Sequence, residues 1–236
     1  MTPEFWTVHS DLPRQGPGEP ADVAWAIERA SLGGAVRILD AGCGPGADIE
    51  TFAAMLPEAH VTGVEMHAPF VEDARKRNAL HAERITLVTG DMREIEGSYD
   101  LIWSAGAMYF VGVEEGLRLF RDRLAPGGHV CFTQPVTPSE ATEADRAFWE
   151  GAAVTDEAGV AEDVRAAGFE VVGARRISDA AWEAYYIPME RRLAALRDGA
   201  PSEALERAVS AAEDEIARWR ADGGRNDYLQ LLVRPA

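Results

Sequence analysis

The segment of this chain that is most informative about chemistry is a glycine-rich turn that follows an acid. The mostly apolar residues 36–39 lead into Asp40, and glycines follow at alternate positions, at Gly42, Gly44 and Gly46. A strand that leads through a glycine-rich turn into a helix brings backbone close to a nucleotide-like ligand in α/β proteins. Glycine is needed there because a Cβ would block close approach or forbid the dihedrals of the turn. The spacing D-x-G-x-G-x-G differs from the dinucleotide fingerprint G-x-G-x-x-G.

Two further acids follow the next two predicted strands. Glu65 ends the segment 60–65, and Asp91 follows the segment 85–88 within a Gly-Asp-Met sequence. Ligands of open parallel sheets bind beyond the carboxyl ends of the strands, where the strand order reverses. At that position Glu65 can accept hydrogen bonds from both hydroxyls of a ribose, which indicates an adenosine-containing ligand. For Asp91 the alternative is a turn residue that caps a helix.

Short apolar segments alternate with helical patterns along the chain, which predicts βαβ units and a mainly parallel sheet. The predicted strands comprise residues 36–40, 60–65, 85–88, 99–103, 129–133, 169–177 and 228–233. The predicted helices comprise residues 46–56, 68–81, 113–124 and 158–167, and residues 179–223 are also expected to be helical. We therefore expect an α/β fold with a doubly wound, seven-stranded, mostly parallel sheet whose last strand is antiparallel, together with helical lid elements.

Two segments interrupt this alternation and suggest how the chain is organised. A loop rich in proline and glycine lies in residues 1–35. Residues 179–223 carry one apolar stripe with helical spacing, formed by Leu205, Val209, Ala212, Ile216 and Trp219. The stripe is expected to pack on the core or on a partner subunit, so a homodimer is one possibility. We expect three regions: a helix and loop over residues 1–35 that cover the ligand site, a core of residues 36–178 and 224–236, and a helical insertion or lid of residues 179–223.

Composition and charge narrow the classes of protein that are compatible with this chain. The 236 residues are 47% hydrophobic, which is enough for one core domain with a cap. A net charge of −17 opposes a nucleic-acid partner, because such partners require a basic surface. The apolar runs are too short for a membrane span, and no signal peptide is visible. Two cysteines, Cys43 and Cys131, indicate reduced thiols and a cytoplasmic location. The histidines and cysteines lack metal-ligand spacing, so no metal is expected.

These motifs resemble, in order and in spacing, those of the class I S-adenosylmethionine-dependent methyltransferases. The resemblance covers residues 36–135 and includes Asp100 in a Tyr-Asp-Leu-Ile-Trp strand and the Pro126-Gly127-Gly128 turn. An N-terminal Arg-Gln-Gly-Pro-Gly loop and a Trp-x-x-Tyr-Tyr segment that begins at Trp182 are similar to a small bacterial, type 11-like subgroup with unassigned substrates. The resemblance implies a Rossmann-like methyltransferase fold. It also implies S-adenosylmethionine as cofactor and S-adenosylhomocysteine as product.

The resemblance further implies which residues bind the cofactor. Asp91 would meet the adenine amino group, and the next residue, Met92, would pack on the ring. The cofactor site implied in this way comprises Gln15, Asp40, Gly42, Cys43, Gly44, Gly46, Glu65, Met66, Asp91, Met92 and Ser104. One departure from the subgroup lies after the fourth predicted strand, where this chain has Ala105 in place of a glutamate.

Aromatic residues are the candidates for the acceptor pocket, because aromatic faces tolerate cationic methylated groups. Tyr109, Tyr185 and Tyr186 are the predicted catalytic or substrate-pocket residues, and Trp182 and His9 are further candidates. The predicted function is transfer of a methyl group to a nitrogen, oxygen or carboxylate of a small-molecule acceptor by in-line displacement. Two alternatives stay open: a catalytically silent protein that binds the cofactor, suggested by Ala105, and a nicotinamide oxidoreductase, which the glycine spacing disfavours.

Overall fold

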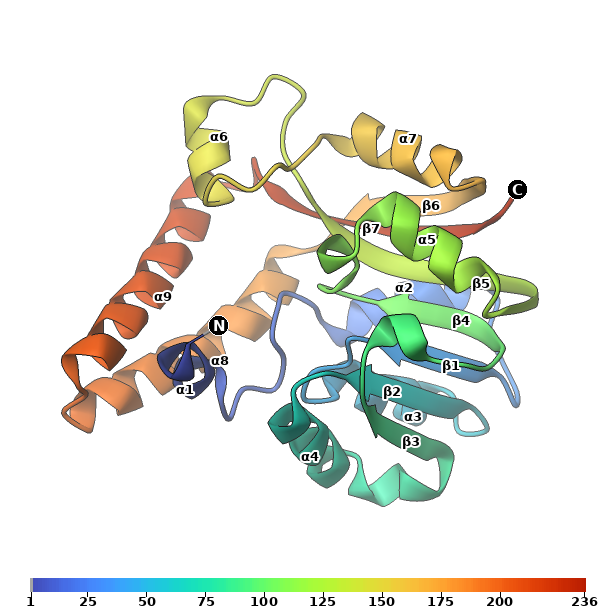
Figure 1. The fold of residues 1–236 in the computed structure, drawn as a ribbon, viewed down its shortest axis with the longest axis horizontal. Coiled ribbons are helices and arrows are strands. Elements are labelled where there is room, and N and C mark those ends of the chain that lie inside the picture. The colour runs from blue at the N-terminus through green and yellow to red at the C-terminus, as the bar shows by residue number, and fades with distance from the viewer. Residues whose placement is uncertain (1) are drawn as a thin grey trace.

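Seven strands form one sheet in the computed structural model, which describes residues 2–236 (Figure 1). The strand order is β3-β2-β1-β4-β5-β7-β6. Strands β1 to β5 are parallel, and β7 is antiparallel to both β5 and β6. The seven-stranded, mostly parallel sheet with an antiparallel last strand is therefore confirmed. The strands are β1 (Arg37–Ala41), β2 (His60–Glu65), β3 (Ile85–Thr89), β4 (Tyr99–Ser104), β5 (Leu124–Val136), β6 (Phe169–Arg176) and β7 (Asp227–Pro235).

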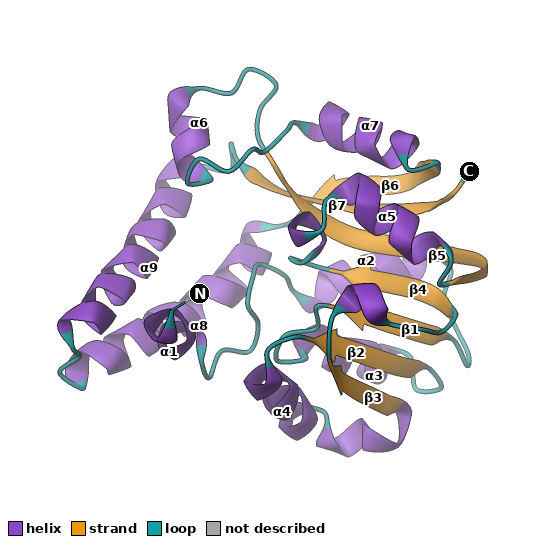
Figure 2. Cartoon of the chain, in the orientation of Figure 1, coloured by secondary structure: helices purple, strands orange, loops and turns teal. Residues whose placement is uncertain are grey.

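Helices cover both faces of this sheet and also form a separate group at one side of it (Figure 2). The α-helices are α1 (Pro3–His9), α2 (Pro20–Arg29), α3 (Ala47–Met55), α4 (Ala68–Arg77), α5 (Val113–Arg121), α6 (Glu143–Phe148), α7 (Glu157–Ala166), α8 (Asp179–Asp198) and α9 (Glu203–Asp222). Three short 3-10 helices are η1 (Ala79–Arg84), η2 (Met92–Glu94) and η3 (Met108–Phe110). None of the helices in residues 2–236 has the length and apolar character that crossing a membrane requires.

Two apolar clusters hold the helices to the two faces of the sheet. On one face, Leu117 and Phe120 of α5 and Val160 of α7 are buried against strand residues. On the other face, Val23 of α2 and Phe52 of α3 belong to a second buried cluster with β1, β2 and β4. Burying both faces removes a large apolar area from water and fixes the register of the strands between the two layers.

The strand order reverses between β1 and β4, and this reversal sets the position of the site. Strand β1 pairs with β2 on one side and with β4 on the other, with Asp40 in register with Gly63 and Trp103. The connections that leave the carboxyl ends of β1 and β4 therefore turn in opposite directions, which opens a crevice between them. Asp40 and the glycine turn begin at this crevice.

The local differences from the predicted elements have physical causes. The helix predicted over 68–81 ends at Arg77, because the amide Nδ2 of Asn78 donates to the carbonyls of Ala74 (2.9 Å) and Gly46 (3.1 Å), and η1 follows. The helix predicted over 113–124 ends at Arg121, since β5 already begins at Leu124 and contains the predicted Pro-Gly-Gly turn. Helix α6, capped by Thr142, was not predicted.

The helical segment over 179–223 consists of two helices that pack on the N-terminal helix. Figure 1 shows α8 and α9 meeting at a sharp angle beside the sheet, with α1 next to α8. Val8 of α1 lies in the same buried cluster as Leu193 of α8 and Ile216 of α9. A side chain of α8, Arg192, also donates to the carbonyl of Thr7 at 3.0 Å. The two segments that interrupt the strand and helix alternation therefore pack on each other.

A buried ion pair joins α2 to the sheet and predicts a pH-dependent stability. Asp22 lies 2.6 Å from Arg175 of β6 and is 3% exposed. Burial raises the pKa of Asp22 from 3.8 to about 6, although Arg175 and the Glu19 amide oppose the rise. The folded state then binds a proton more tightly than the unfolded state does. The stability that Asp22 contributes is therefore greatest below about pH 4 and is lost as the pH rises through about 6.

The change attributable to Asp22 is expected to reach about 3 kcal/mol across this range. It can be measured by urea unfolding of the wild type and of Asp22→Asn, which cannot titrate, at several pH values from 4 to 7. The free energy of unfolding of the wild type relative to the variant should fall as the pH rises. A difference that does not depend on pH would contradict the prediction.

Candidate cofactor and acceptor site

The glycine turn after β1 has the backbone geometry that its sequence predicts. Gly42, Gly44 and Gly46 have φ values of +86°, +51° and +80°, in the region that favours glycine. The amides of Gly42 and Cys43 both donate to the carbonyl of Val64, at 2.9 and 3.0 Å. The turn is thus attached to the end of β2, which brings the glycines beside Glu65.

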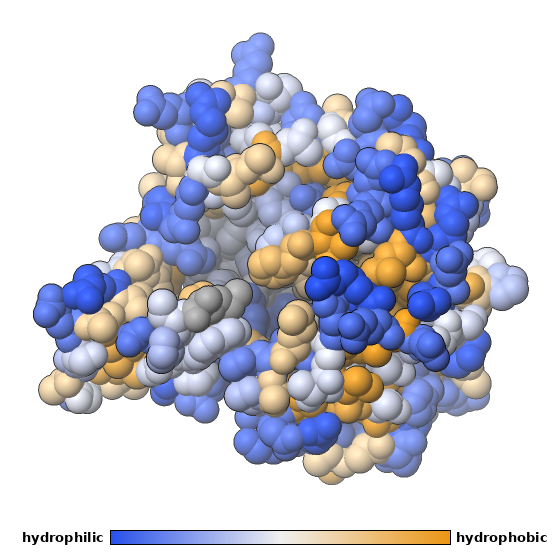
Figure 3. Space-filling model, in the orientation of Figure 1, coloured by the Kyte–Doolittle hydropathy of each residue, from blue (hydrophilic) through white to orange (hydrophobic). Residues whose placement is uncertain are grey.

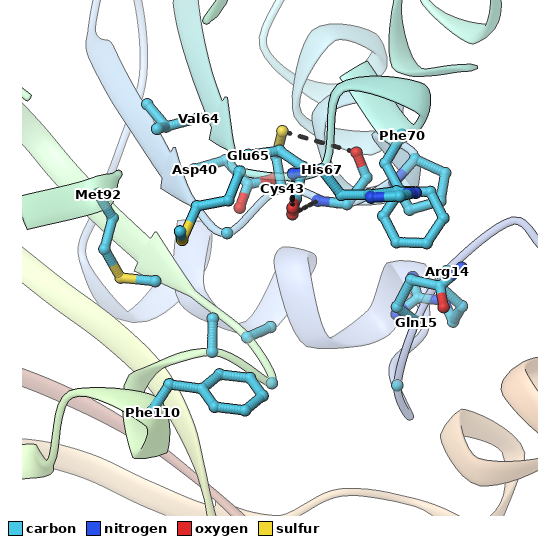
Figure 4. Close-up of a pocket in the computed structure, with 18 of the residues that line it drawn as sticks. Arg14, Gln15, Asp40, Cys43, Val64, Glu65, His67, Phe70, Met92 and Phe110 are labelled. Atoms are coloured by element: carbon cyan, nitrogen blue, oxygen red, sulfur yellow. Dashed lines mark hydrogen bonds between the residues drawn. The ribbon is translucent and has the colours of Figure 1, made fainter. Parts of the chain in front are cut away.

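A cavity of about 590 Å³ lies over this turn, at the carboxyl ends of β1 to β4. The glycine turn and the residues after β2, β3 and β4 form one part of its wall, and α1 with the loop 13–17 forms another. Figure 4 shows Gln15 and Arg14 across the cavity from Met92, with the Glu65 carboxylate between them and Phe110 on a further side. The volume is typical of a pocket for a small molecule.

Glu65 holds both the turn and the start of the next connection. Its Oε2 accepts a hydrogen bond from the amide of Gly44 at 3.1 Å, and its Oε1 accepts one from the amide of His67 at 2.7 Å. These bonds fix the carboxylate at the centre of the cavity wall (Figure 4). A fixed carboxylate loses little conformational entropy when it accepts further hydrogen bonds from a ligand.

Asp91 lies two residues after β3 and is paired with a neighbouring arginine. The side chain of Arg93 donates to the Asp91 carboxylate, with Nε 2.9 Å from Oδ2, and the Arg93 amide donates to Oδ1 at 2.9 Å. These hydrogen bonds lower the pKa of Asp91. Asp91 also caps η2, as the alternative reading of the sequence predicted. It lines the cavity as well, so it combines both roles.

Asp40 is a buried acid with an unpaired oxygen. It is 3% exposed, and its Oδ2 has no hydrogen-bond partner among the described residues. Burial raises the pKa of Asp40, the nearby Asp48 and Glu65 carboxylates raise it further, and Arg14 opposes the rise. An unpaired buried carboxylate is costly, so this position suits a ligand that carries a positive charge or a strong donor.

Asp48 and its partners were not predicted as site residues. Arg14 of the N-terminal loop lies 2.7 Å from Asp48, and the indole Nε1 of Trp103 donates to the same carboxylate at 3.0 Å. This pair fastens the loop to the start of α3. The only signal in the sequence was the place of Asp48 directly after the glycine turn, and its partners lie 34 and 55 positions away in the chain.

Aromatic side chains of α1 close the cavity from the outside. The ring of Trp6 stacks on His67 with the centroids 3.7 Å apart, and Phe70 packs against both rings. His9 contacts Gln15, with Nδ1 and Oε1 3.0 Å apart. Sequence reasoning included His9 and Gln15 but missed Trp6, because a lone tryptophan near a chain end carries no spacing signal.

The structure brings most of the predicted site residues to this cavity. The predicted cofactor residues on its wall are Gln15, Asp40, Gly42, Cys43, Gly44, Glu65, Met66, Asp91 and Met92, and Tyr109 lies at its edge with Ala105. Gly46 and Ser104 do not line it. Gly46 faces Ala74 of α4, and the buried Ser104 donates to the carbonyl of Ala41 at 3.0 Å. Both residues therefore contact the elements that hold the glycine turn in place and do not face the cavity.

The aromatic residues of α8 lie away from the cavity wall. Trp182, Tyr185 and Tyr186 are buried in the cluster that α8 forms with α9 and α1. The Tyr186 hydroxyl donates to Glu215 of α9 at 3.0 Å, and the Trp182 indole donates to Asp227 at 2.8 Å. Their role as substrate contacts stays a prediction. Of the predicted substrate-pocket tyrosines, Tyr109 is the one that lines the cavity.

Both cysteines are expected to be unreactive in the folded protein. Burial raises the pKa of Cys43, and the neighbouring carboxylates of Asp40 and Glu65 raise it further. Burial also raises the pKa of the fully buried Cys131. Because the thiolate is the reactive form, we expect no rapid reaction of either thiol with Ellman's reagent at pH 8, and reaction of both in urea. Fast modification of one thiol in the native protein would contradict this.

Among residues 2–236 there is no group of three or more histidine, cysteine, aspartate or glutamate side chains that could hold a metal ion. The site therefore consists of carboxylates, backbone amides and aromatic rings around a turn of glycines.

Comparison with known proteins matches residues 38–128 to a family described as a methyltransferase domain. The matched segment begins in β1, contains the glycine turn, Glu65 and Asp91, and ends at Gly128. The chain carries a methyltransferase domain. This finding confirms the resemblance to class I enzymes that the motifs indicate, and the domain supplies every strand end that borders the cavity.

The curated relatives of this methyltransferase domain match it over part of their length. The chain is 34% identical over 112 residues to a trans-aconitate 2-methyltransferase of Paracidovorax citrulli, which covers 46% of this chain and 42% of the relative. It is 31% identical over 101 residues to a malonyl-[acyl-carrier protein] O-methyltransferase of Priestia megaterium, which covers 42% of this chain and 36% of the relative. The chain thus spans less than half the length of these relatives.

Solved structures match the fold over the whole chain. A S-adenosylmethionine-dependent methyltransferase from Geobacter sulfurreducens, solved with S-adenosylhomocysteine, has a TM-score of 0.87 at 19% identity and covers 100% of this chain and 99% of that chain. A similar enzyme from Thiobacillus denitrificans has a TM-score of 0.84 at 20% identity, with coverage of 100% and 99%. At this identity the match shows the fold, which includes the helical segments outside the methyltransferase domain.

Proposed function

We propose that this protein binds S-adenosylmethionine in the cavity over the glycine turn and transfers its methyl group to a small-molecule acceptor. The observation that carries the proposal is the set of three carboxylates, Asp40, Glu65 and Asp91, that lie at or just after the carboxyl ends of three neighbouring strands and all line one cavity. S-adenosylmethionine carries a sulfonium and an ammonium group against one carboxylate, so an acidic wall suits its net positive charge.

The residues present fit this cofactor group by group. The fixed carboxylate of Glu65 would accept hydrogen bonds from the ribose hydroxyls, since it already lies at the end of β2 with both oxygens oriented. Asp91 would accept one from the adenine amino group, with Met92 against the ring. The unpaired Oδ2 of Asp40 would accept one from the ammonium group of the methionine part, which would relieve the cost of its burial.

The protein's part in such a reaction is to orient the acceptor and to exclude water. S-adenosylmethionine supplies an activated methyl group, which leaves the sulfonium sulfur while the electrons of the broken bond stay on sulfur. Orientation alone can contribute roughly 7–11 kcal/mol to the acceleration of such a step. We propose that α1 and the loop 13–17 act as the lid, because Trp6 and Arg14 close the cavity through His67 and Asp48.

The acceptor enters from the side of Tyr109 in this proposal. Curated relatives are named for trans-aconitate and for a malonyl group, both of which carry carboxylates. An anionic acceptor would need a cation to bind it, but the two arginines that line this cavity are already paired, Arg14 with Asp48 and Arg93 with Asp91. This observation favours an uncharged or cationic acceptor. The catalytically silent alternative is not favoured.

Calorimetric titration with S-adenosylhomocysteine tests the cofactor part of the proposal, and the expected result is saturable binding at micromolar concentrations. A methyl-release assay with a panel of amines, alcohols and carboxylates then tests turnover. Absence of binding even at millimolar S-adenosylhomocysteine would overturn the proposal. Turnover of reduced nicotinamide dinucleotide, or its tight binding in a fluorescence titration, would instead favour the oxidoreductase.

A further inference from the structure

We propose that the acceptor carries an ammonium group, which binds against a group of aromatic rings and a carboxylate beyond Tyr109. This aromatic group comprises Tyr109, Trp182, Tyr186, Trp219 and Tyr228, and its carboxylate belongs to Glu215 of α9. The inference rests on the proposed methyl transfer and adds the chemical class of the acceptor.

The rings of this aromatic group form a continuous set from the cofactor cavity to α9. Tyr109 lines the cavity, and its ring centroid lies 6.4 Å from that of Tyr228 in β7. Tyr228 packs against Trp182 at 5.5 Å. Trp182 in turn stacks with Tyr186 and with Trp219, each at 5.7 Å. Tyr109, Trp219 and Tyr228 are partly exposed, whereas Trp182 and Tyr186 are buried behind them, so a cationic group of the acceptor would contact the partly exposed rings.

The molecule is hollowed on this side. Figure 3 shows a depression between the part that contains α6 and α9 and the part that contains the sheet, and Figure 1 shows α8 passing behind the same region. Trp149, directly after α6, packs edge-on against Tyr228 with the centroids 5.6 Å apart, so the end of α6 contacts the aromatic group. In this proposal the acceptor enters through this depression, so α1 would not have to open for it.

Glu215 provides the negative charge of this group. It is half-buried, and its one hydrogen bond among the described residues comes from the Tyr186 hydroxyl at 3.0 Å. Burial raises its pKa, and Tyr186 and Arg218 oppose the rise. Arg218 lies near Glu215 but pairs with Glu150 at 2.6 Å, so two acids share this one cation. No ion pair of Glu215 within 4 Å occurs in residues 2–236.

Aromatic faces beside a carboxylate select cations over neutral or anionic groups of the same shape. Ring faces attract an ammonium through their quadrupole whatever its number of N–H bonds, so primary, methylated and quaternary ammonium groups are all bound. A carboxylate acceptor would be repelled by Glu215 and by the acids of the cofactor wall. The acceptor class that fits is therefore a small amine.

Binding of a matched pair of probes tests this inference directly. Choline and 3,3-dimethyl-1-butanol share one shape and differ in a single positive charge. In the presence of saturating S-adenosylhomocysteine, we expect choline to quench the fluorescence of the tryptophans with a Kd about tenfold lower than that of the neutral alcohol. Equal affinity of the two probes, or no saturable binding of choline at tens of millimolar, would overturn the inference.

Variants of Glu215 test whether its charge causes the preference for choline. The Glu215→Gln protein keeps an oxygen that can accept from Tyr186 but loses the charge, so the preference for choline should fall to the part that the rings contribute, while the Kd for S-adenosylhomocysteine stays unchanged. Glu213→Gln, on the same helix in an exposed pair with Arg197, is the control and should keep the preference. If Glu215→Gln does not fold, Trp219→Leu tests the ring contribution and should weaken choline binding.

The outcomes separate this inference from the proposed function. Loss of S-adenosylhomocysteine binding in the wild type would contradict the cofactor site itself. Normal cofactor binding with no preference for choline would contradict only the amine class. A preference for choline that is as large in Glu215→Gln as in the wild type would contradict the assignment of the charge to Glu215.

Discussion

Replacement of Glu65 by alanine is expected to weaken the binding of S-adenosylhomocysteine by about a hundredfold, which corresponds to roughly 3 kcal/mol. Two hydrogen bonds from ribose hydroxyls to one carboxylate would be lost, each of the strength typical of a bond to a charged group. The backbone amides of Gly44 and His67 would also lose their acceptor, so the turn would be less ordered before binding. Calorimetric titration measures the change.

Two further variants control this experiment. Glu65→Gln keeps one carbonyl acceptor and should show a smaller loss, of about tenfold. Glu58→Ala removes an exposed acid before the same strand and should leave the Kd unchanged. Thermal unfolding verifies that each variant is folded. An unchanged Kd in Glu65→Ala would show that the ligand is not held by its ribose at β2.

Replacement of Gly46 by alanine is expected to lower the free energy of unfolding by about 3 kcal/mol. The backbone there has φ +80°, which costs an L-residue about 1–2 kcal/mol. The added Cβ would lie 2.9 Å from the Cβ of Ala74 and 2.7 Å from Nδ2 of Asn78, and relief of such crowding costs a further 1–3 kcal/mol or so. Urea unfolding measures the total.

Gly34 offers a matched control for this prediction. Its φ is +69°, but a Cβ added there meets no heavy atom within 4 Å. Gly34→Ala should therefore show only the backbone cost, of about 1 kcal/mol. The difference between the two variants isolates the contact between the glycine turn and α4. Equal losses would show that α4 moves away at no cost.

Much of the fold could be predicted from the sequence because the sheet strands are short apolar segments separated by helices of regular period. The parallel strands β1 to β4 were predicted to within about two residues. Helix boundaries were less accurate where a side chain from elsewhere decides them. The end of α4 depends on the bonds of Asn78 to Gly46, 32 positions away, which no local pattern reports.

The residues of the candidate site also differ in how well the sequence predicts them. Residues at or near the carboxyl end of a strand, such as Glu65 and Asp91, could be placed because the carboxyl ends of parallel strands lie at one edge of the sheet. Contacts between distant segments could not be placed. The stack of Trp6 on His67 and the pair of Arg14 with Asp48 depend on how the N-terminal segment packs, and that packing is set by a buried cluster shared with α8 and α9.

The sheet, its glycine turn and the methyl donor of this proposal could be inferred from the sequence, since each depends on residues that are close along the chain. The residues proposed for the acceptor come together only in the folded chain. Tyr185 and Tyr186 are buried in the cluster of α1, α8 and α9, and Glu215 of α9 lies within hydrogen-bond distance of Tyr186. Side chains that are far apart in sequence meet through packing of whole helices, and periodicity within one helix carries no information about its partner.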